Sequence, residues 1–432
     1  MKGFTSPAIQ PARGEPAAEA NGRRTEVDVL VVGSGPGGSA AAYHLARHGV
    51  DVLLIDKARF PREKVCGDGL TPRGVKAIQA MGVDPTEAGF IRVDGLRVYG
   101  PTVTLSLPWP KLESFPDYGV VRTRHDFDHL LVQRAVKAGA TLWESTEAET
   151  PLVDGGWVVG ARVKREDGEP ETVRARYVIA ADGASSRFAG KAGVRRDPTR
   201  PLGVAARRYY RSPRDQGTYL ESWFDLWEHD VILPGYGWIF PIGDGILNVG
   251  AGLLNTTSYF KEMSPRRMLD AFIRSLPGEW GIAEENAEGQ LLSGPLPMGM
   301  NRRPLALPGL LLVGDAGGLI NPFTGEGIAY AVESGEIAAE LIHDALASGR
   351  PGLAHVYPVV VRQRYGKYFT LGRLFARAIG QPRIMRYSVE HGFPHERLMR
   401  FALRLLANLT DGREGDLDDR VMDWIVRVAP ER

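Results

Sequence analysis

Residues 27–56 read VDVLVVGSGPGGSAAAYHLARHGVDVLLID, and this stretch decides the fold. The apolar run at 27–32 is short and nearly continuous, as is typical of a parallel strand that is buried on both faces. The glycine turn after it predicts an alanine-rich helix that stops at Gly49. The apolar residues at 51–56 predict a second strand. The order strand, helix, strand makes a βαβ unit, so we expect an α/β fold built on a parallel sheet.

The glycines of this unit have the spacing of a dinucleotide-binding loop, because Gly33, Gly35 and Gly38 form G-x-G-x-x-G. Gly33 permits a tight turn, Gly35 lets the backbone approach a pyrophosphate, and Gly38 allows the helix to pack on the strand. Asp56 ends the next strand, where a carboxylate binds ribose hydroxyls and repels a 2′-phosphate, which argues against NADP at this site. The loop does not by itself choose between NAD and FAD. We also expect contacts with the cofactor from Pro36, Gly37 and Lys57.

Composition limits the classes of protein to consider. The 432 residues include 53 Lys and Arg against 52 Asp and Glu, so a net charge of +1 gives no general attraction for nucleic acid. The single cysteine excludes an intramolecular disulfide and fits a reducing compartment. Residues 1–25 lack the apolar core of a signal peptide and predict a disordered lead. We expect a cytoplasmic protein that is soluble, or peripheral at the inner face of the cell membrane, with no nucleic acid partner and no metal.

The rest of the chain predicts a composite architecture. Buried strands that end in glycine turns return at 175–184 and 307–317, and a helix is expected at 328–347. Residues 204–252 are rich in aromatic and β-branched residues, which favours an antiparallel sheet. We expect a discontinuous cofactor domain at 26–100, 118–200 and 295–350. We expect a substrate-binding sheet domain at 101–117 and 201–294, and a helical region at 351–432.

Three motifs later in the chain indicate which dinucleotide is bound, because they resemble those of a known protein family. RHDFD contains Arg124, VIAADGASSR contains Asp182 and Gly183, and LLVGDAGGLINPFTGEGI contains Asp315. In this order the motifs resemble the large flavoprotein family that includes aromatic hydroxylases and geranylgeranyl reductases. The resemblance implies FAD and a Rossmann-like FAD-binding domain of the aromatic-hydroxylase type, with an inserted antiparallel substrate domain. It also implies cofactor contacts from Arg124, Ala148, Asp182, Gly183, Asp315, Gly325, Gly327 and Ile328.

Two further motifs narrow the resemblance to the geranylgeranyl reductases and related polyprenyl reductases. Pro61, Cys66 and Gly67 match P-x-x-x-x-C-G, and GYGWIFP matches Y-x-W-x-F-P. The string CGDGLTPR is similar to that of the actinobacterial menaquinone reductases, which saturate one isoprene unit of the quinone tail. The resemblance implies that Cys66, Gly67, Asp68 and Gly69 pass close to the flavin.

The chemistry of these motifs has alternatives. Cys66 is either a small polarisable edge of the pocket or a catalytic thiol that orients the alkene or helps deliver a proton. Asp68 either caps a turn or is a desolvated carboxylic acid that donates a proton. Tyr236, Trp238 and Phe240 alternate, so their side chains share one face of a strand. That face is either core packing or a flat apolar wall for an isoprenoid substrate.

The sequence therefore predicts an FAD-dependent reductase of an isoprenoid double bond, with the menaquinone side chain as the leading substrate. A flavin monooxygenase or halogenase acting on an aromatic metabolite is the alternative within enzymes. A prenyl-lipid escort protein without flavin is the alternative outside catalysis. No second nucleotide loop is evident, so the electron donor is left open between NAD(P)H and another carrier. The arginine-rich apolar helices of the last 80 residues either close the core or rest on lipid.

Overall fold

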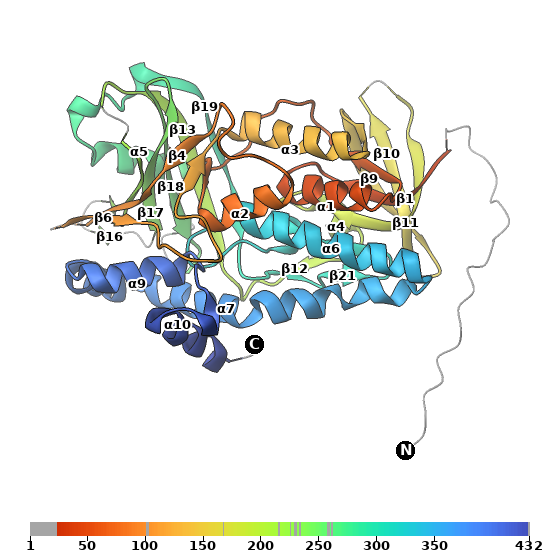
Figure 1. Ribbon diagram of the computed structural model, residues 1–432. Helices are drawn as coiled ribbons and strands as arrows, with labels where there is room; N and C mark the ends of the chain where they lie inside the picture. The colour runs from red at the N-terminus through yellow and green to blue at the C-terminus, as the bar shows by residue number, and fades with distance from the viewer. Residues whose placement is uncertain are drawn as a thin grey trace.

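The computed structural model describes residues 24–430 except 101–102, 167, 215–216, 225, 229–230, 233–234, 257–259 and 261. Figure 1 shows two β layers side by side, with long helices across and beneath them. The predicted N-terminal lead lies outside the described residues as far as residue 23, and strand β1 (Arg24–Val32) begins directly after it.

The first sheet has β1 at its centre. Strand β1 pairs in parallel with β11 (Glu171–Ala180) on one side and with β2 (Val52–Ile55) on the other. The strand order is β21-β22-β11-β1-β2-β8, and β10 and β9 extend it antiparallel from β11. This arrangement confirms the predicted parallel sheet. The remaining strands are β8 (Thr141–Trp143), β9 (Thr146–Asp154), β10 (Trp157–Arg165), β21 (Ala306–Leu307) and β22 (Leu310–Leu312).

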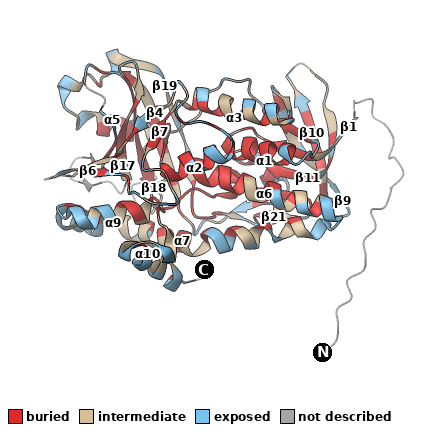
Figure 2. Ribbon diagram, in the orientation of Figure 1, coloured by how far each residue is buried: buried red, intermediate tan, exposed pale blue. Residues whose placement is uncertain are grey.

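Helices α1 (Pro36–Arg47) and α6 (Ile328–Ser348) pack tightly on one face of this sheet. Their contact is made by small residues, and a Cβ at Gly335 would lie only 2.4 Å from the carbonyl oxygen of Gly37. Helix α3 (Arg124–Ala138) lies beside α1. Figure 2 shows the buried residues gathered on α1, α2 and α6 and inside both sheets. The first helix ends before Gly49, as predicted.

The second sheet is largely antiparallel and has the order β19-β13-β18-β17-β14-β5-β6. Only β14 and β5 pair in parallel. Strand β5 was placed in the cofactor domain by the predicted boundary at residue 100, but it pairs with β6 and β14 and so joins the second sheet. The strands are β5 (Gly95–Tyr99), β6 (Thr104–Pro108), β13 (Leu202–Arg211), β14 (Tyr219–Trp223), β17 (Gly235–Gly243), β18 (Ile246–Leu254) and β19 (Ala287–Pro297).

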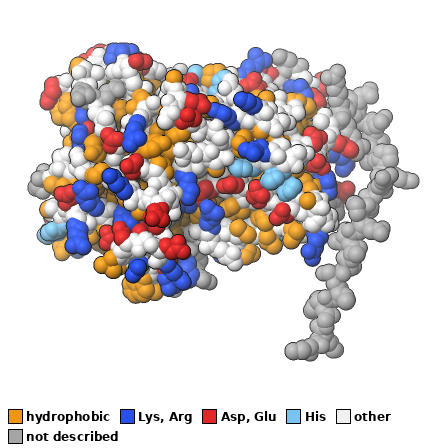
Figure 3. Space-filling model, viewed as in Figure 1, with side chains coloured by type: hydrophobic (Ala, Val, Ile, Leu, Met, Phe, Trp, Pro, Cys, Tyr) orange, Lys and Arg blue, Asp and Glu red, His pale blue; other side chains and the backbone are white. Residues whose placement is uncertain are grey.

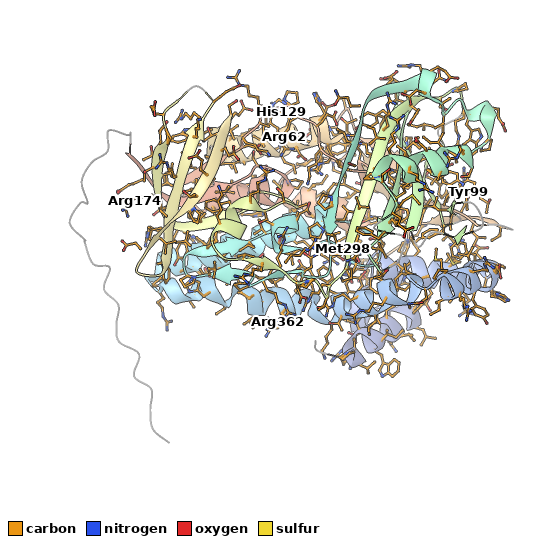
Figure 4. The ribbon with its side chains drawn as sticks, turned by 180° about the vertical axis from the view of Figure 1, so that it is seen from behind. Arg62, Tyr99, His129, Arg174, Met298 and Arg362 are labelled. Atoms are coloured by element: carbon orange, nitrogen blue, oxygen red, sulfur yellow. The ribbon has the colours of Figure 1, made fainter. Side chains whose placement is uncertain are left out.

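Short elements connect the two sheets. Strands β3 (Gly69–Leu70), β7 (Gly119–Val121) and β4 (Ile91–Val93) form a small sheet, and helix α2 (Pro72–Ala80) follows β3. The cysteine loop, residues 61–71, thus leads from the first sheet into this small sheet. Figure 4 shows Met298 near the junction of the two large sheets and Tyr99 far out on the second sheet. The other described short elements are α4 (Arg187–Lys191), β12 (Arg195–Arg196), β15 (Trp227–Glu228), β16 (Val231–Ile232), α5 (Pro265–Arg274) and β20 (Arg302–Arg303).

The C-terminal region is helical, as expected. Helix α7 (Tyr357–Ile379) runs beneath α6, and α8 (Pro382–Tyr387), α9 (Glu396–Leu406) and α10 (Leu417–Val428) follow it (Figure 1). Figure 3 shows hydrophobic side chains at the lower edge of the molecule over α10. Within the described ranges, none of the helices combines the length and apolar character that crossing a bilayer requires.

Candidate active site

The glycine loop leaves the N-terminus of α1 open to a ligand. Gly33 has a φ of +97° and lies so close to Ala181 that any side chain would collide with its backbone. At Gly35 the nearest atom to an added Cβ is 3.9 Å away, so this part of the loop has free space beside its backbone. No side chain caps α1, and its first N–H groups are therefore available to an anion. This loop fits the pyrophosphate of a dinucleotide.

Asp56 lies at the end of β2 and holds the loop in place. Its Oδ2 accepts hydrogen bonds from the backbone nitrogen and the hydroxyl of Ser34, at 3.0 and 2.9 Å. Arg62 lies 3.4 Å from the same oxygen and also donates to Asp128 at 3.0 Å. Figure 4 shows Arg62 beside His129 on this edge of the molecule. Asp56 is buried, whereas Lys57 is exposed to solvent. Asp56 is therefore positioned as a ribose ligand should be, and a contact from Lys57 stays a prediction.

Arg124 begins helix α3 and is held by a residue one turn further along. Its guanidinium donates to both oxygens of Asp128, at 2.6 and 2.8 Å, and both side chains are buried. The Cys66 thiol lies close enough to this guanidinium to contribute to the shift in the pKa of Arg124. Burial opposes the charge on Arg124, but the neighbouring carboxylate outweighs it, so the pKa of Arg124 is raised. This ion pair fixes the Arg124 guanidinium beside the cysteine loop, whose Asp68 accepts from the Arg124 backbone nitrogen.

Asp68 is the fully buried centre of the cysteine loop. It adopts a left-handed φ of +68°, which is unusual for a residue with a side chain. Its Oδ2 accepts hydrogen bonds from the Tyr209 hydroxyl and the Asn248 amide, each at 2.7 Å, and its Oδ1 accepts from the backbone nitrogen of Arg124 at 3.0 Å. Burial raises the pKa of Asp68 to about 6, although Arg207 and these donors favour the carboxylate.

The cysteine loop lies directly against the aromatic strand β17. A Cβ at Gly67 would stand 2.9 Å from a ring carbon of Phe240 and 3.3 Å from Nε1 of Trp238. The ring centroids of Tyr236 and Trp238 are 5.8 Å apart, and those of Trp238 and Phe240 are 6.4 Å apart. The three aromatic side chains therefore share one face, as predicted, and that face meets the loop that contains Cys66.

Asp315 and Asp182 occupy the two glycine turns that follow strands of the first sheet. Asp315 pairs with Lys64 of the cysteine loop at 3.2 Å, which joins two motifs that are far apart in the sequence. Asp182 accepts from the Ser186 hydroxyl at 3.1 Å and from the backbone nitrogen of Phe188 at 3.0 Å, so it also shapes its own turn. Ala148 lies in β9 and packs against the apolar cluster of β1 and β2. Cofactor contacts from these residues stay predictions.

The loop that precedes α6 contains an acid that the sequence did not single out. Glu326 lies between Gly325 and Gly327, and its Oε1 accepts a hydrogen bond from the Thr71 hydroxyl at 2.7 Å. Burial raises the pKa of Glu326 to about 7, despite the bond from Thr71. The Tyr236 hydroxyl donates to the carbonyl oxygen of Thr324 in the same loop at 2.8 Å. The aromatic strand, the cysteine loop and this loop therefore meet.

Taken together, the geometry offers a backbone cradle for a dinucleotide and a set of apolar and acidic groups beside it. The structure brings together two sets of groups. The first set is the glycine loop with Asp56. The second set is the cysteine loop with Arg124, the aromatic strand and the loop before α6. Two carboxyls stand in the second set: Asp68 is fully buried, and Glu326 is half-buried with its Oε2 atom inside the protein. The sequence analysis did not single out five residues that the structure places in this arrangement: Lys64, Asp128, Tyr209, Asn248 and Glu326.

Comparison with known proteins places these features in context. A sequence profile described as FAD binding domain matches residues 26–208. Menaquinone reductase of Mycolicibacterium smegmatis is 36% identical over 94% of this chain and 95% of that protein. Digeranylgeranylglycerophospholipid reductase of Thermoplasma volcanium is 34% identical over 78% of this chain and 84% of that protein.

Solved structures give the same overall picture. A geranylgeranyl bacteriochlorophyll reductase-like protein from Thermoplasma acidophilum has a TM-score of 0.72 and 28% identity, over 88% of this chain and all (100%) of that one. A flavin-dependent brominase has a TM-score of 0.72 at 22% identity, over 93% of this chain and 98% of that one. At that identity the brominase shares the fold, and the likeness carries no further argument.

Proposed function

This chain belongs to the geranylgeranyl reductase family of FAD-dependent oxidoreductases, and from that premise we propose that it saturates a carbon–carbon double bond in the polyprenyl side chain of menaquinone. The single observation that carries this proposal is the contact between the cysteine loop and the aromatic strand. Gly67 leaves no room for a side chain in front of Phe240 and Trp238. The two motifs that distinguish polyprenyl reductases in the sequence are therefore one surface in space.

The aromatic strand continues into a longer apolar row. The ring centroids of Tyr236 and Phe224 are 5.8 Å apart, and those of Phe224 and Phe393 are 5.5 Å apart. Phe393 lies between α8 and α9, so the row leads from the cysteine loop to the C-terminal helices. A row of aromatic faces suits a long isoprenoid chain, which has no hydrogen-bonding groups to be recognised.

The chain's own residues supply placement and exclude water. Bound FAD, once reduced, supplies the two electrons that an isolated double bond needs. Asp56, Ser34 and the open end of α1 would hold the dinucleotide part, and Arg124 and Asp315 would lie toward the flavin part. The apolar wall keeps water from the reacting carbons, and fixed orientation against a rigid strand raises the rate.

The choice of menaquinone is supported by the menaquinone reductase of Mycolicibacterium smegmatis, which is similar over nearly the whole chain.

We infer also that the protein binds its lipid substrate at a membrane surface, from the cytoplasmic side. Leu417, Trp424 and Val428 of α10 support this, because 59 to 70% of each residue's surface is exposed on one side of the helix. Co-sedimentation with vesicles that contain anionic phospholipid tests this part, and protein that stays in the supernatant with every vesicle would reject it.

The main test is a product analysis. The purified yellow protein is reduced with dithionite without oxygen and incubated with menaquinone in detergent. A gain of two hydrogens in the quinone tail, seen by mass spectrometry, is the expected result. Geranylgeranyl diphosphate and a geranylgeranylated phospholipid are run in parallel, because a gain there alone would move the substrate to another prenyl lipid. No gain with any of the three rejects polyprenyl reduction, and oxygen incorporated under air would favour a monooxygenase.

A further inference from the structure

The two carboxyls of the site differ in how their oxygens are satisfied. Asp68 accepts three hydrogen bonds, and both of its oxygens have partners. Glu326 accepts one, from Thr71 on Oε1, while its Oε2 is buried and has no hydrogen-bond partner among the described residues. A buried polar oxygen without a partner is rare in native proteins and points to a ligand or a catalytic role.

The surroundings of Glu326 also disfavour a permanent charge. The nearest guanidinium, that of Arg73, is paired with Glu333 at 2.8 Å, and the Tyr365 hydroxyl donates to that same carboxylate. Glu326 itself has no ion pair among the residues that the structure describes. A carboxyl in this position favours its neutral form, because burial outweighs the stabilisation of its charge by Arg73, which is already paired with Glu333.

The position of Glu326 is beside the proposed substrate wall. The Tyr236 hydroxyl donates to the carbonyl oxygen of Thr324, which is in the same loop as Glu326, at 2.8 Å. A Cβ at Gly325 would lie 3.8 Å from the same hydroxyl oxygen and 3.7 Å from Cε of Met298. Glu326 is therefore only two residues from Thr324, the residue to which Tyr236 of the aromatic row is bonded.

We propose that Glu326 is the catalytic acid that delivers the proton to the alkene, through its unpartnered Oε2. This inference rests on the proposed function. In the step, the π bond of the alkene breaks, and one carbon forms a C–H bond with the proton of Glu326. The other carbon forms a C–H bond with the hydrogen and two electrons that reduced FAD supplies. Glu326 is left as a carboxylate and is protonated again from water before the next turnover.

Of the two roles that the sequence left open for Asp68, this assignment favours the one that shapes the loop over proton donation. Its oxygens are engaged by Arg124, Tyr209 and Asn248, so it is a positioning residue that fixes the cysteine loop. Cys66 stands beside Arg124 and can shape the pocket without carrying the proton. The reaction then needs one acid, and Glu326 is the one with a carboxyl oxygen that has no hydrogen-bond partner among the described residues.

The pH behaviour expected of this acid depends on every charged or titratable group that faces it. Arg73 favours its carboxylate, whereas Glu333 and burial favour its neutral form. The tyrosines around it, Tyr236, Tyr330 and Tyr368, all have pKa values raised by burial and stay neutral. Glu326 is therefore protonated below about pH 7, and the single-turnover rate falls as the pH rises through this range.

The test compares Glu326→Gln with Glu336→Gln, a matched control. Glu336 is also a half-buried carboxyl of this region, in α6, whose pKa is raised by burial. Each protein is loaded with FAD, reduced with dithionite and mixed with menaquinone, and the hydrogenated product is followed through one turnover at pH 5.5 to 8.5. We expect Glu326→Gln to be about 100-fold slower or more and to lose the fall above pH 7. Glu336→Gln and Glu326→Asp should retain the pH dependence.

Two further readouts separate a catalytic role from a structural one. The affinity for FAD and the midpoint potential of bound FAD should match the wild type in Glu326→Gln. In the infrared difference spectrum of wild type minus Glu326→Gln at pH 6, the band of one neutral carboxylic acid should remain, because the bands of Asp68 and other carboxyls are common to both proteins and cancel. Turnover within threefold of wild type, or a loss of FAD affinity that accounts for the slower rate, overturns the proposal. A wild-type protein that hydrogenates no prenyl lipid overturns the proposed function first, whatever the variant does.

Discussion

Asn248 donates from its side-chain amide both to the carbonyl oxygen of Cys66, at 2.9 Å, and to Oδ2 of Asp68, at 2.7 Å. Its own oxygen accepts from Nε1 of Trp238 at 3.0 Å. One fully buried side chain in β18 therefore fixes the cysteine loop and the aromatic strand relative to each other. The proposed substrate wall and the loop behind it are a single rigid unit as a result.

Replacing Asn248 by Ala should loosen this unit. The change removes the hydrogen-bond partner of the Trp238 ring nitrogen and of the Cys66 carbonyl, and it removes one of the two donors to Oδ2 of Asp68. All three groups lie inside the protein. We expect the free energy of unfolding in urea to fall by about 2–4 kcal/mol, since each unsatisfied buried group costs about 1–3 kcal/mol. Asn286→Ala is the control, because Asn286 makes one bond to the Gly281 carbonyl at 2.8 Å and should cost less than half as much. Equal losses in the two variants would refute the bridging role of Asn248.

Gly67 and Gly69 form a matched pair for the shape of the loop. A Cβ at Gly67 would lie 2.9 Å from Phe240, so Gly67→Ala forces the ring to move. At Gly69 the nearest atoms are 3.4 Å away, which is ordinary contact. We expect Gly67→Ala to slow alkene reduction by about 10- to 100-fold, because small displacements of a positioned substrate are costly. Gly69→Ala should stay within about threefold, and the rates are compared per bound FAD, read from the visible spectrum, so that a change in FAD content does not enter the comparison. Equal rates in the two variants would show that the wall does not position the substrate.

The parts of the molecule that local patterns determine could be predicted. The strand, glycine turn and helix at 27–49 follow from apolar runs and glycine spacing, and they appear as β1 and α1. The ordered motifs at Arg124, Asp182 and Asp315 predicted the family and FAD, and the comparisons confirm both. The predicted domain boundary at residue 100 does not reflect the pairing of strand β5, because its partners, β14 and β6, are set by long-range contacts that a strand pattern does not show.

The missed residues share a physical reason. Asn248 is the one polar side chain in a strand of nine buried residues, and that mismatch was the available signal. Asp128 stands four residues after Arg124, the spacing of an ion pair on a helix. Glu326 looks like an ordinary turn residue between glycines, because its burial depends on Thr71 and Arg73, which are some 250 residues away in the sequence. Tertiary packing, rather than any local pattern, makes it unusual.

Asp56 should control the affinity for FAD. Asp56→Ala removes the acceptor of both Ser34 bonds and the carboxylate that faces the expected ribose. Hydrogen bonds to a charged group contribute about 1.5–3 kcal/mol, so the dissociation constant should rise by about 10- to 100-fold. Titration of the apoprotein with FAD, followed by quenching of flavin fluorescence, measures this. Asp51→Ala, at the exposed start of the same strand, should bind FAD like the wild type. An unchanged affinity in Asp56→Ala would place the ribose elsewhere.

Asp68 should make stability depend on pH in a defined direction. Its pKa is raised from 3.8 to about 6 in the folded protein, so between these values the folded state binds more protons than the unfolded state. Stability from this group is therefore present at low pH, is lost as the pH rises through 6, and does not change above about pH 7. The full loss in the free energy of unfolding is about 3 kcal/mol, because the pKa differs by about two units between the folded and unfolded states and each unit corresponds to about 1.4 kcal/mol.

The comparison of wild type with Asp68→Asn isolates this effect, because all other groups titrate in both proteins. Urea unfolding is measured every half unit from pH 4 to pH 7.5. The difference in unfolding free energy, variant minus wild type, should increase by about 2 kcal/mol between pH 4 and pH 6 and level off above about pH 7. A flat difference for Asp68→Asn would mean that the three donors around Asp68 cancel the effect of its burial, and a difference that decreases with pH would mean that the donors outweigh it; either result contradicts the prediction.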